Sequence, residues 1–395
     1  MGGIRPEILV WARETAGLSL EEAARAVGLK EARGRAGRDR LAALEAGTEE
    51  PARTLLVKMA QAYRRPLLVF YLSAPPKTGD RGQDFRMLPG PERYNPELDA
   101  LIRDIRGRQG LIRSMLEDAE KEPIDFIGSA TRDLPAADLA VRIANRLGFS
   151  LSEFRAEKTL DAAFAYLRSK IEASGVFVLL LGNLGSYHTN IPVEIFRGFA
   201  VSDAIAPLIV INDQDARAAW AFTALHELAH LWLGDTGISG PEATSRIEQY
   251  CNEVAGEVLG PAEELATFPK MATLAKAIAA ISDGAQERRV SRPMLAYRLL
   301  QAGIISKAMW SELSAHFEKE WQASQKDRAE KQRASDGGPN YYVVRRHRVG
   351  PALLGLVRRS LDEGNVSYTK AGRVLGVKPR NVQPLLYAEM TRGVR

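Results

Sequence analysis

The chain has 395 residues, of which 45% are hydrophobic and 26% charged, a balance typical of globular proteins with two or three domains. Its single cysteine, Cys251, excludes an intramolecular disulfide, and no apolar run reaches the roughly 18 residues that a membrane span requires. The first residues lack a charged-then-apolar signal pattern, so we expect a cytoplasmic protein without membrane contact. The net charge of +5 is modest, but basic residues gather near both ends, which favours contact with nucleic acid.

Residues 1–74 have a helical pattern throughout. Ser19 and Glu22 form a capping-box sequence at the start of a short helix, which Gly28 ends. Together with the segment Leu41–Gly47, this region resembles an XRE-type helix-turn-helix domain. The resemblance implies that the helix after the turn enters the major groove of DNA. The resemblance implies that basic residues near the turn contact phosphates and guanines. These residues are Lys30, Arg33, Arg35, Arg38 and Arg40.

This region departs from a minimal helix-turn-helix at Glu31 to Asp39, which looks like an insertion. Gly34 and Gly37 inside it each weaken a helix by about 1 kcal/mol relative to alanine. The recognition element is therefore either displaced or a basic loop, which affects base reading more than phosphate attraction. A protein-interaction module of four or five helices that does not bind DNA is the alternative. XRE-type modules commonly dimerise, so the resemblance also allows a homodimer.

A linker and helical region is expected over residues 75–165. The segment Pro75–Gly82 has the composition of a linker. Helical periodicity then covers about Pro96–Glu120 and Pro135–Gly148, and it returns over Leu160–Ser174 at the border of the next domain.

A catalytic domain is expected over residues 166–317. Three strand-like runs come first, in the order Val176–Leu181, Phe196–Ser202 and Leu208–Asn212. A helix with Asp215 as its N-cap then extends to Leu233, and a second helix spans about Ser245–Leu259. Three strands between groups of helices predict an α+β catalytic domain with a small three-stranded sheet, inside a chain that is mainly α.

The helix that ends near Leu233 carries the sequence His226-Glu227-Leu228-Ala229-His230. Residues four apart share one face of a helix, so both imidazoles can reach one tetrahedral Zn²⁺. Glu227 is then placed to hold and deprotonate a metal-bound water. The motif fixes only three positions, but two of the five histidines fall in it and the preceding residues are apolar. The alternative is an exposed helix that carries two hydrogen-bonded histidines.

A catalytic zinc needs a third protein ligand and one open position. We favour Glu248 on the next helix, because Asn252 follows one turn later and can accept a hydrogen bond from a ligand histidine. Glu257 is the alternative third ligand. Cys251 offers a thiolate, but a small buried residue on the core face of the helix is the simpler interpretation.

The second helix resembles that of the ImmA/IrrE metallopeptidases, which read roughly E-x-x-A-N-x-F-A-x-x-L-L-x-P after their HExxH helix. The matching positions are Glu248, Asn252, Ala255, Leu259 and Pro261. Cys251, Val254 and Gly260 replace the usual Ala, Phe and Met, which changes packing and not ligands. The resemblance implies a gluzincin-like zinc endopeptidase that cleaves a repressor or another regulatory protein in a stress, phage-defence or mobile-element response.

Two further features near the motif have open interpretations. The strand Phe196–Ser202 is either an edge strand that pairs with the substrate backbone or an internal strand. Tyr187 or His188, in the connection between strands, either stabilises an oxyanion or lies at a loop surface.

The end of the chain is expected to hold a linker over 318–339 and a third, helical domain over 340–395. The linker is charged, rich in glutamine and ends in Gly337-Gly338-Pro339. In the domain, a short helix from Tyr368 is followed by Gly376 and a basic segment, a pattern typical of helix-turn-helix geometry. Nucleic-acid contact and a dimerisation or substrate-docking role are both open.

Two functions therefore compete. The first is a zinc metalloendopeptidase that acts on a protein substrate and is steered by DNA-binding ends. The second is a transcriptional regulator or antitoxin that uses a peptidase-like domain mainly to bind a partner. The intact Glu227 favours the enzyme, because binding alone does not need a general base.

Overall fold

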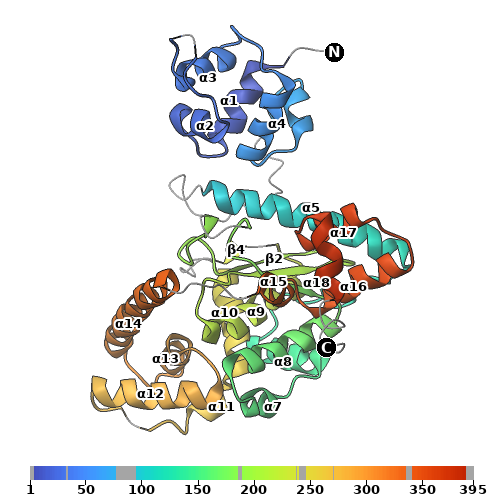
Figure 1. Ribbon diagram of the computed structural model, residues 1–395. Helices are drawn as coiled ribbons and strands as arrows, with labels where there is room; N and C mark the ends of the chain where they lie inside the picture. Colours follow the sequence, from blue (N-terminus) through green and yellow to red (C-terminus); the bar gives the residue numbers. More distant parts are fainter. Residues whose placement is uncertain are drawn as a thin grey trace. The chain divides into compact units, whose positions relative to one another are not determined.

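The structure is a computed structural model of the whole chain, and it describes residues 4–32, 34–76, 95–185, 189–236, 238–239, 246–269, 271–334 and 340–387. The chain divides into two compact units (Figure 1). One unit comprises residues 1–104 with 184–189, and the other comprises residues 105–183 with 190–395. The architecture is mainly helical around one small sheet, as predicted. No helix in the described ranges is long and apolar enough to cross a membrane.

The first unit is a bundle of short helices. They are α1 (Pro6–Glu14), α2 (Leu20–Ala26), α3 (Gly37–Glu45), α4 (Arg53–Ala62) and the 3-10 helix η1 (Leu67–Tyr71). Ser19 and Glu22 form the predicted capping box at the start of α2. The core contains Ile8, Leu41 and Phe70, and an ion pair of 2.8 Å joins Arg13 of α1 to Glu45 of α3.

Within the predicted insertion Ala32 and Arg35 form an isolated bridge, and its last residues, from Gly37 to Asp39, belong to α3. The helix expected from Leu41 begins four residues earlier, at Gly37. The glycine does not prevent this start because it occupies the first position of the helix, where propensity matters little. Arg38 and Arg40 therefore lie on α3 itself.

The second unit is built around a four-stranded sheet. Its strands are β1 (Phe177–Leu180), β2 (Gly198–Val201), β3 (Leu208–Ile211) and β4 (Ile238–Ser239), in the spatial order β1-β3-β2-β4. β1 is parallel to β3, whereas β2 is antiparallel to both β3 and β4. The three predicted strands are present. The fourth strand, β4, was not predicted, because a strand of two residues has no recognisable sequence pattern. β2 is internal, so of the two interpretations left open for Phe196–Ser202 the internal strand is confirmed and the edge strand is wrong.

Helices surround this sheet. The first group comprises the second half of α5 (Pro96–Asp118), then α6 (Ala136–Leu147), α7 (Leu151–Ala156) and α8 (Leu160–Ala173). α9 (Arg217–Trp232) packs against β2, β3 and α8, and α10 (Arg246–Leu259) packs against α9 and α6 (Figure 1). The common core includes Leu225, Leu228 and Val254. Asp215 does not cap α9, because Ala216 is the N-cap and the buried Asp215 side chain pairs with Arg197 at 3.0 Å.

The remaining helices are α11 (Ala262–Leu265), α12 (Leu274–Arg288), α13 (Arg292–Gln301) and α14 (Lys307–Ala334). The linker predicted over 318–339 is thus helical as far as Ala334. Its Ala, Glu, Lys and Gln residues are strong helix formers, so the segment continues the helix despite its charged composition. Gln322 donates to Glu318 at 2.8 Å one turn away, which is a typical contact of such a helix.

The C-terminal helices are α15 (Tyr341–Val349), α16 (Pro351–Asp362), α17 (Tyr368–Leu375), the 3-10 helix η6 (Pro379–Asn381) and α18 (Val382–Tyr387). They are helical as predicted. α15 contacts β1 and α16 contacts α8, and these helices belong to the same compact unit as the sheet. The sequence predicted a separate third domain over 340–395. In the structure α15 and α16 instead bury their amphipathic faces against the sheet and α8.

Candidate metal centre

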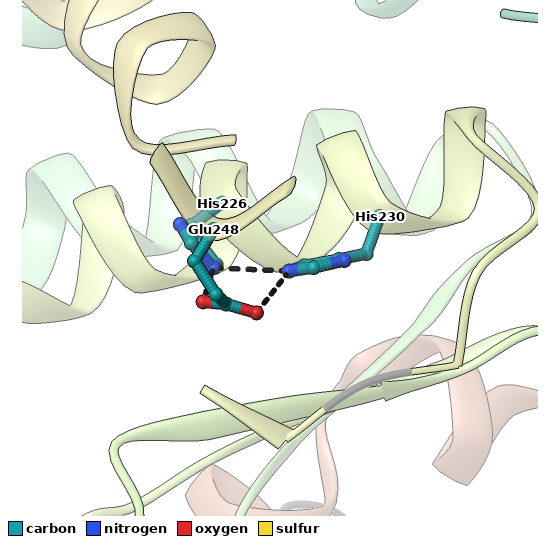
Figure 2. Close-up of side chains that lie close together, drawn as sticks. All are labelled: His226, His230 and Glu248. Atoms are coloured by element: carbon teal, nitrogen blue, oxygen red, sulfur yellow. Dashed lines mark hydrogen bonds and ion pairs between the residues drawn. The ribbon is translucent and has the colours of Figure 1, made fainter. Parts of the chain in front are cut away.

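The two motif histidines lie side by side on α9. The last three turns of this helix are almost entirely buried, and His226 and His230 are 3% and 0% exposed. Their spacing of four residues places both rings on the face that α10 covers. The Nε2 atoms are 3.1 Å apart (Figure 2). The alternative of an exposed helix is therefore wrong.

Glu248 reaches both rings from the first turn of α10. Its Oε2 atom lies 3.1 Å from Nε2 of His226, and its Oε1 atom lies 3.2 Å from Nε2 of His230 (Figure 2). α10 is held in this position by an apolar face that includes Val254, Ala255 and Val258. The three side chains are brought together as the sequence predicts.

This cluster fits a tetrahedral metal ion. The ligand atoms of His226, His230 and Glu248 all lie within 4.8 Å of one another. Zinc bonds of 2.0–2.1 Å at tetrahedral angles separate neighbouring ligand atoms by about 3.3 Å, close to the distances found here. Two imidazoles and one carboxylate are also a set of donors that catalytic zinc uses. The residues present therefore fit a zinc ion and leave one coordination position open.

The charge states of Glu248 and His226 suit a cation. Burial raises the pKa of Glu248, but the two imidazoles outweigh it and hold the pKa at about 2. The carboxylate is therefore ionised throughout the physiological range. Burial lowers the pKa of His226, so its ring is neutral and able to donate a lone pair.

The outer contacts of the two histidines differ. Burial lowers the pKa of His226, and Asn252 raises it by a smaller amount. Among the described residues the Nδ1 atoms of His226 and His230 have no hydrogen-bond partner, so the predicted hydrogen bond to Asn252 is not formed. Asp235 lies 3.5 Å from Nδ1 of His230, a contact that the sequence analysis missed. Although burial lowers the pKa of His230, Asp235 and Cys251 raise it well above its usual value. The only available signal for Asp235 was its place in the turn that ends α9, where its backbone N–H donates to the carbonyl of His230.

Neither alternative ligand joins the cluster. The carboxylate of Glu257 pairs with Arg298 at 2.5 Å and accepts from the backbone N–H of Ala262 at 3.2 Å. Cys251 is fully buried, and burial raises the pKa of its thiol, so it is a neutral packing residue. Tyr187 and His188 lie outside the described residues.

Glu227 faces the sheet. Its side chain is fully buried and lies against Gly198, the first residue of β2. A Cβ atom at position 198 would lie 2.8 Å from Oε1 of Glu227 and 2.5 Å from Cγ2 of Thr223. Only glycine therefore allows β2 to approach α9 this closely.

We expect Gly198→Ala to lower the free energy of unfolding by about 1–3 kcal/mol, because the added methyl group overpacks the contact with Glu227. Urea unfolding measures the loss. Gly110→Ala is the control, since nothing lies within 4 Å of that position and the change should be neutral or stabilising. Equal stability of the two variants would contradict this account of the close approach.

A cleft of about 430 Å³ opens beside His226, Glu248 and Asn252. Its far wall comes from α13 and α14. The large aromatic and thioether side chains that line it are Phe222, Met294, Tyr297 and Trp310, and Arg197 and Arg298 also border it. Nothing in the spacing of these residues along the sequence indicates that they meet, because the helices that carry them are brought to the site by tertiary packing.

The residues predicted to contact DNA in the first unit differ in their exposure and in their partners. Lys30 and Arg38 are exposed. Arg35 pairs with Glu49 at 2.5 Å, and Arg40 donates to the carbonyl of Lys30 at 2.9 Å. Arg33 lies outside the described residues. Arg38 lies 3.8 Å from the carboxylate of Asp39, so three of these cations have partners within the unit.

The chain was compared with known proteins. Residues 186–300 match the family model of the IrrE N-terminal-like domain, peptidase family M78. No curated protein and no solved structure matches the chain. The match includes His226, Glu227, His230 and Glu248 but neither end of the chain. The metal-ligand cluster therefore lies within a segment that is similar to the ImmA/IrrE metallopeptidases.

Proposed function

We propose that this protein is a zinc-dependent endopeptidase that cleaves a repressor or another regulatory protein, and that its N-terminal unit directs it to DNA. The observation that carries the proposal is the juxtaposition of His226, His230 and Glu248, with Glu227 beside them on α9. The family match of this segment supports the peptidase assignment.

His226, His230 and Glu248 would hold the metal. When bound, zinc polarises the scissile carbonyl and lowers the pKa of water toward about 7. The buried, apolar surroundings of the cluster strengthen the attraction between its charged groups. Asp235 would keep the ring of His230 oriented, which is the usual role of partners in the outer shell of a metal site.

Glu227 would act as the general base and then as the general acid. It takes a proton from the attacking water while the water oxygen bonds to the carbonyl carbon of the substrate. When the C–N bond breaks, the same carboxyl group delivers that proton to the departing nitrogen. The contact of Glu227 with Gly198 fixes the direction in which the carboxylate points.

The cleft beside the cluster would receive a substrate side chain. Its aromatic and thioether wall, formed by Phe222, Met294, Tyr297 and Trp310, suits a large apolar residue next to the scissile bond. Such residues are normally buried in a folded protein, so a flexible segment of a regulator is the expected target.

The N-terminal unit would supply location. Its short helices, the capping box at Ser19 and the exposed Lys30 and Arg38 support DNA binding of the helix-turn-helix kind. A peptidase held on DNA meets a DNA-bound repressor at high local concentration. Dimerisation through this unit is part of the proposal.

The test is co-expression with the proteins that neighbouring genes encode, followed by mass spectrometry of the fragments. Wild-type protein is compared with Glu227→Gln, which keeps the shape of the side chain but removes the base. We expect a defined fragment pair with the wild type and a loss of at least about 100-fold in its amount with the variant, a typical contribution of a general base. Identical fragments from both proteins would overturn the peptidase proposal.

A further inference from the structure

The C-terminal helices concentrate positive charge. Residues 340–387 contain two acidic residues, Asp362 and Glu363, and nine basic ones, namely Arg345, Arg346, Arg348, Arg358, Arg359, Lys370, Arg373, Lys378 and Arg380. This excess of seven exceeds the net charge of +5 of the whole chain, so the rest of the protein is slightly acidic. A charge this localised creates a field that attracts an anionic partner.

Some of these cations have structural roles, which separates them from the others. Arg345 is buried and donates to the carbonyls of Leu375 and Gly376 at 2.8 and 2.7 Å. Arg346 donates to the carbonyl of Leu385 at 2.9 Å. Five others are exposed, namely Arg358, Arg359, Arg373, Lys378 and Arg380.

α17, η6 and α18 have the geometry of a helix-turn-helix. α17 ends at Gly376, which adopts the left-handed conformation with φ of +63°. A Cβ atom at Gly372 would lie 2.8 Å from the carbonyl oxygen of Val377, so glycine permits the turn to fold back on α17. Leu375 and Leu385 are buried between the helices, and Arg345 caps the end of α17. The second helix is therefore held at a fixed angle to the first.

The exposed side of this motif carries hydrogen-bond donors, and Tyr368 at the start of α17 is its exposed large apolar side chain. Lys378 and Arg380 lie just before the second helix, and Gln383 lies in its first turn; all three are exposed. In a helix-turn-helix these are the positions that approach base edges in the major groove. Arg373 is exposed on the first helix, where contacts to the DNA backbone are usual.

The composition of this side selects among partners. A protein-binding surface needs an apolar centre, whereas residues 378–384 read Lys-Pro-Arg-Asn-Val-Gln-Pro, with Val382 buried. Single-stranded nucleic acid is bound mainly by stacking on several aromatic rings. Residues 378–384 contain no aromatic residue, and α17 adds one exposed ring, that of Tyr368. Duplex DNA, which needs cations and hydrogen-bond donors on a protruding helix, fits best.

This surface is fastened to the peptidase core. The buried Arg168 of α8 donates to the carbonyl of His347 at 2.6 Å and also to the carbonyl of Val178 in β1. Its partner Glu172 accepts from the backbone N–H of Ala352 at 3.0 Å. Arg348 pairs at 2.6 Å with Asp213, which directly follows the sheet and precedes α9.

We propose that α17, η6 and α18 form a second duplex-DNA-binding surface, which contacts phosphates through Lys378, Arg380 and Arg373 and places Gln383 in the major groove. This surface and the metal centre belong to one compact unit (Figure 1). Binding at this surface therefore sets the position of the active site on the DNA, independently of the N-terminal unit.

The test measures the affinity of the full-length protein for a fluorescein-labelled 24-base-pair duplex of arbitrary sequence, by anisotropy, at several salt concentrations. The variant is Lys378→Glu with Arg380→Glu. The control is Lys276→Glu with Lys319→Glu, two exposed lysines elsewhere in the same unit, which gives the same change in net charge. Circular dichroism confirms that both proteins are folded.

We expect the Lys378/Arg380 variant to bind at least about tenfold more weakly than the control and to lose about two from the slope of log affinity against log salt. Fragments from the protein substrate should be unchanged in the absence of DNA, so this test can fail while the peptidase proposal stands. Equal affinities of variant and control would overturn the proposal, because binding would then depend on general charge or on the N-terminal unit. Stronger competition by a single strand or an RNA hairpin than by duplex would also overturn it.

Discussion

Glu248→Gln is expected to lower the affinity for zinc by more than about 100-fold, since even partners in the outer shell of a metal site contribute 10- to 100-fold. Glu248 contacts both motif histidines at 3.1 and 3.2 Å, and its carboxylate is fully ionised because its pKa is about 2. A neutral amide of the same shape removes this charge and one good oxygen ligand. Metal content after dialysis, and titration with a competing chelator, measure the effect.

Glu257→Gln is the matched control for this experiment. Both residues lie on α10, both change from carboxylate to amide, and Glu257 was the alternative third ligand. In the structure Glu257 pairs with the buried Arg298, so this variant should retain zinc but lose about 1–3 kcal/mol of stability. Loss of zinc from Glu257→Gln, with retention by Glu248→Gln, would refute the assignment of the third ligand.

Arg168→Met is expected to destabilise the second unit by about 3–5 kcal/mol. The side chains of Arg168 and Glu172 are 5% and 4% exposed, and burial lowers the pKa of the arginine and raises that of the glutamate. Removal of one partner leaves the other charge buried and frees the carbonyls of Val178 and His347. Urea unfolding measures the loss of stability.

A double variant separates the two contributions to that loss. Arg168→Met with Glu172→Leu removes both charges together, so we expect it to recover much of the stability. Limited proteolysis reports how firmly the C-terminal helices are held. We expect the protease to cut within the helices that follow residue 350 more rapidly in the single variant than in the double variant. If the two variants are equally stable, the ion pair does not anchor these helices.

Much of the candidate metal centre could be predicted because it depends on the spacing of residues along single helices. The spacing of His226 and His230 on one helix determines that their rings share a face, and Glu248 and Asn252 sit at matching turns of the next helix. The capping box at Ser19 and the three strands were predictable for the same reason, since each depends on neighbouring residues and on simple periodicity.

Several features could not be predicted because they depend on contacts between distant segments. β4 has two residues, and only its pairing with β2 makes it a strand. The charged composition of 318–334 suggested a linker, yet good helix formers make it part of α14. The cleft wall that includes Trp310 and the contact of Asp235 with His230 likewise arise from packing.

The amino-acid sequence by itself determined which residues are candidates for the site: His226, Glu227 and His230 on one helix and Glu248 on the next. It also determined that basic residues gather near both ends. The tertiary structure alone decided that β2 is internal, that Glu257 faces Arg298 and that the C-terminal helices are joined to α8 and the sheet through Arg168. The physical reason is that periodicity along one element sets which side chains share a face, whereas the partner of that face is chosen by burial of apolar surface and charge across the whole unit.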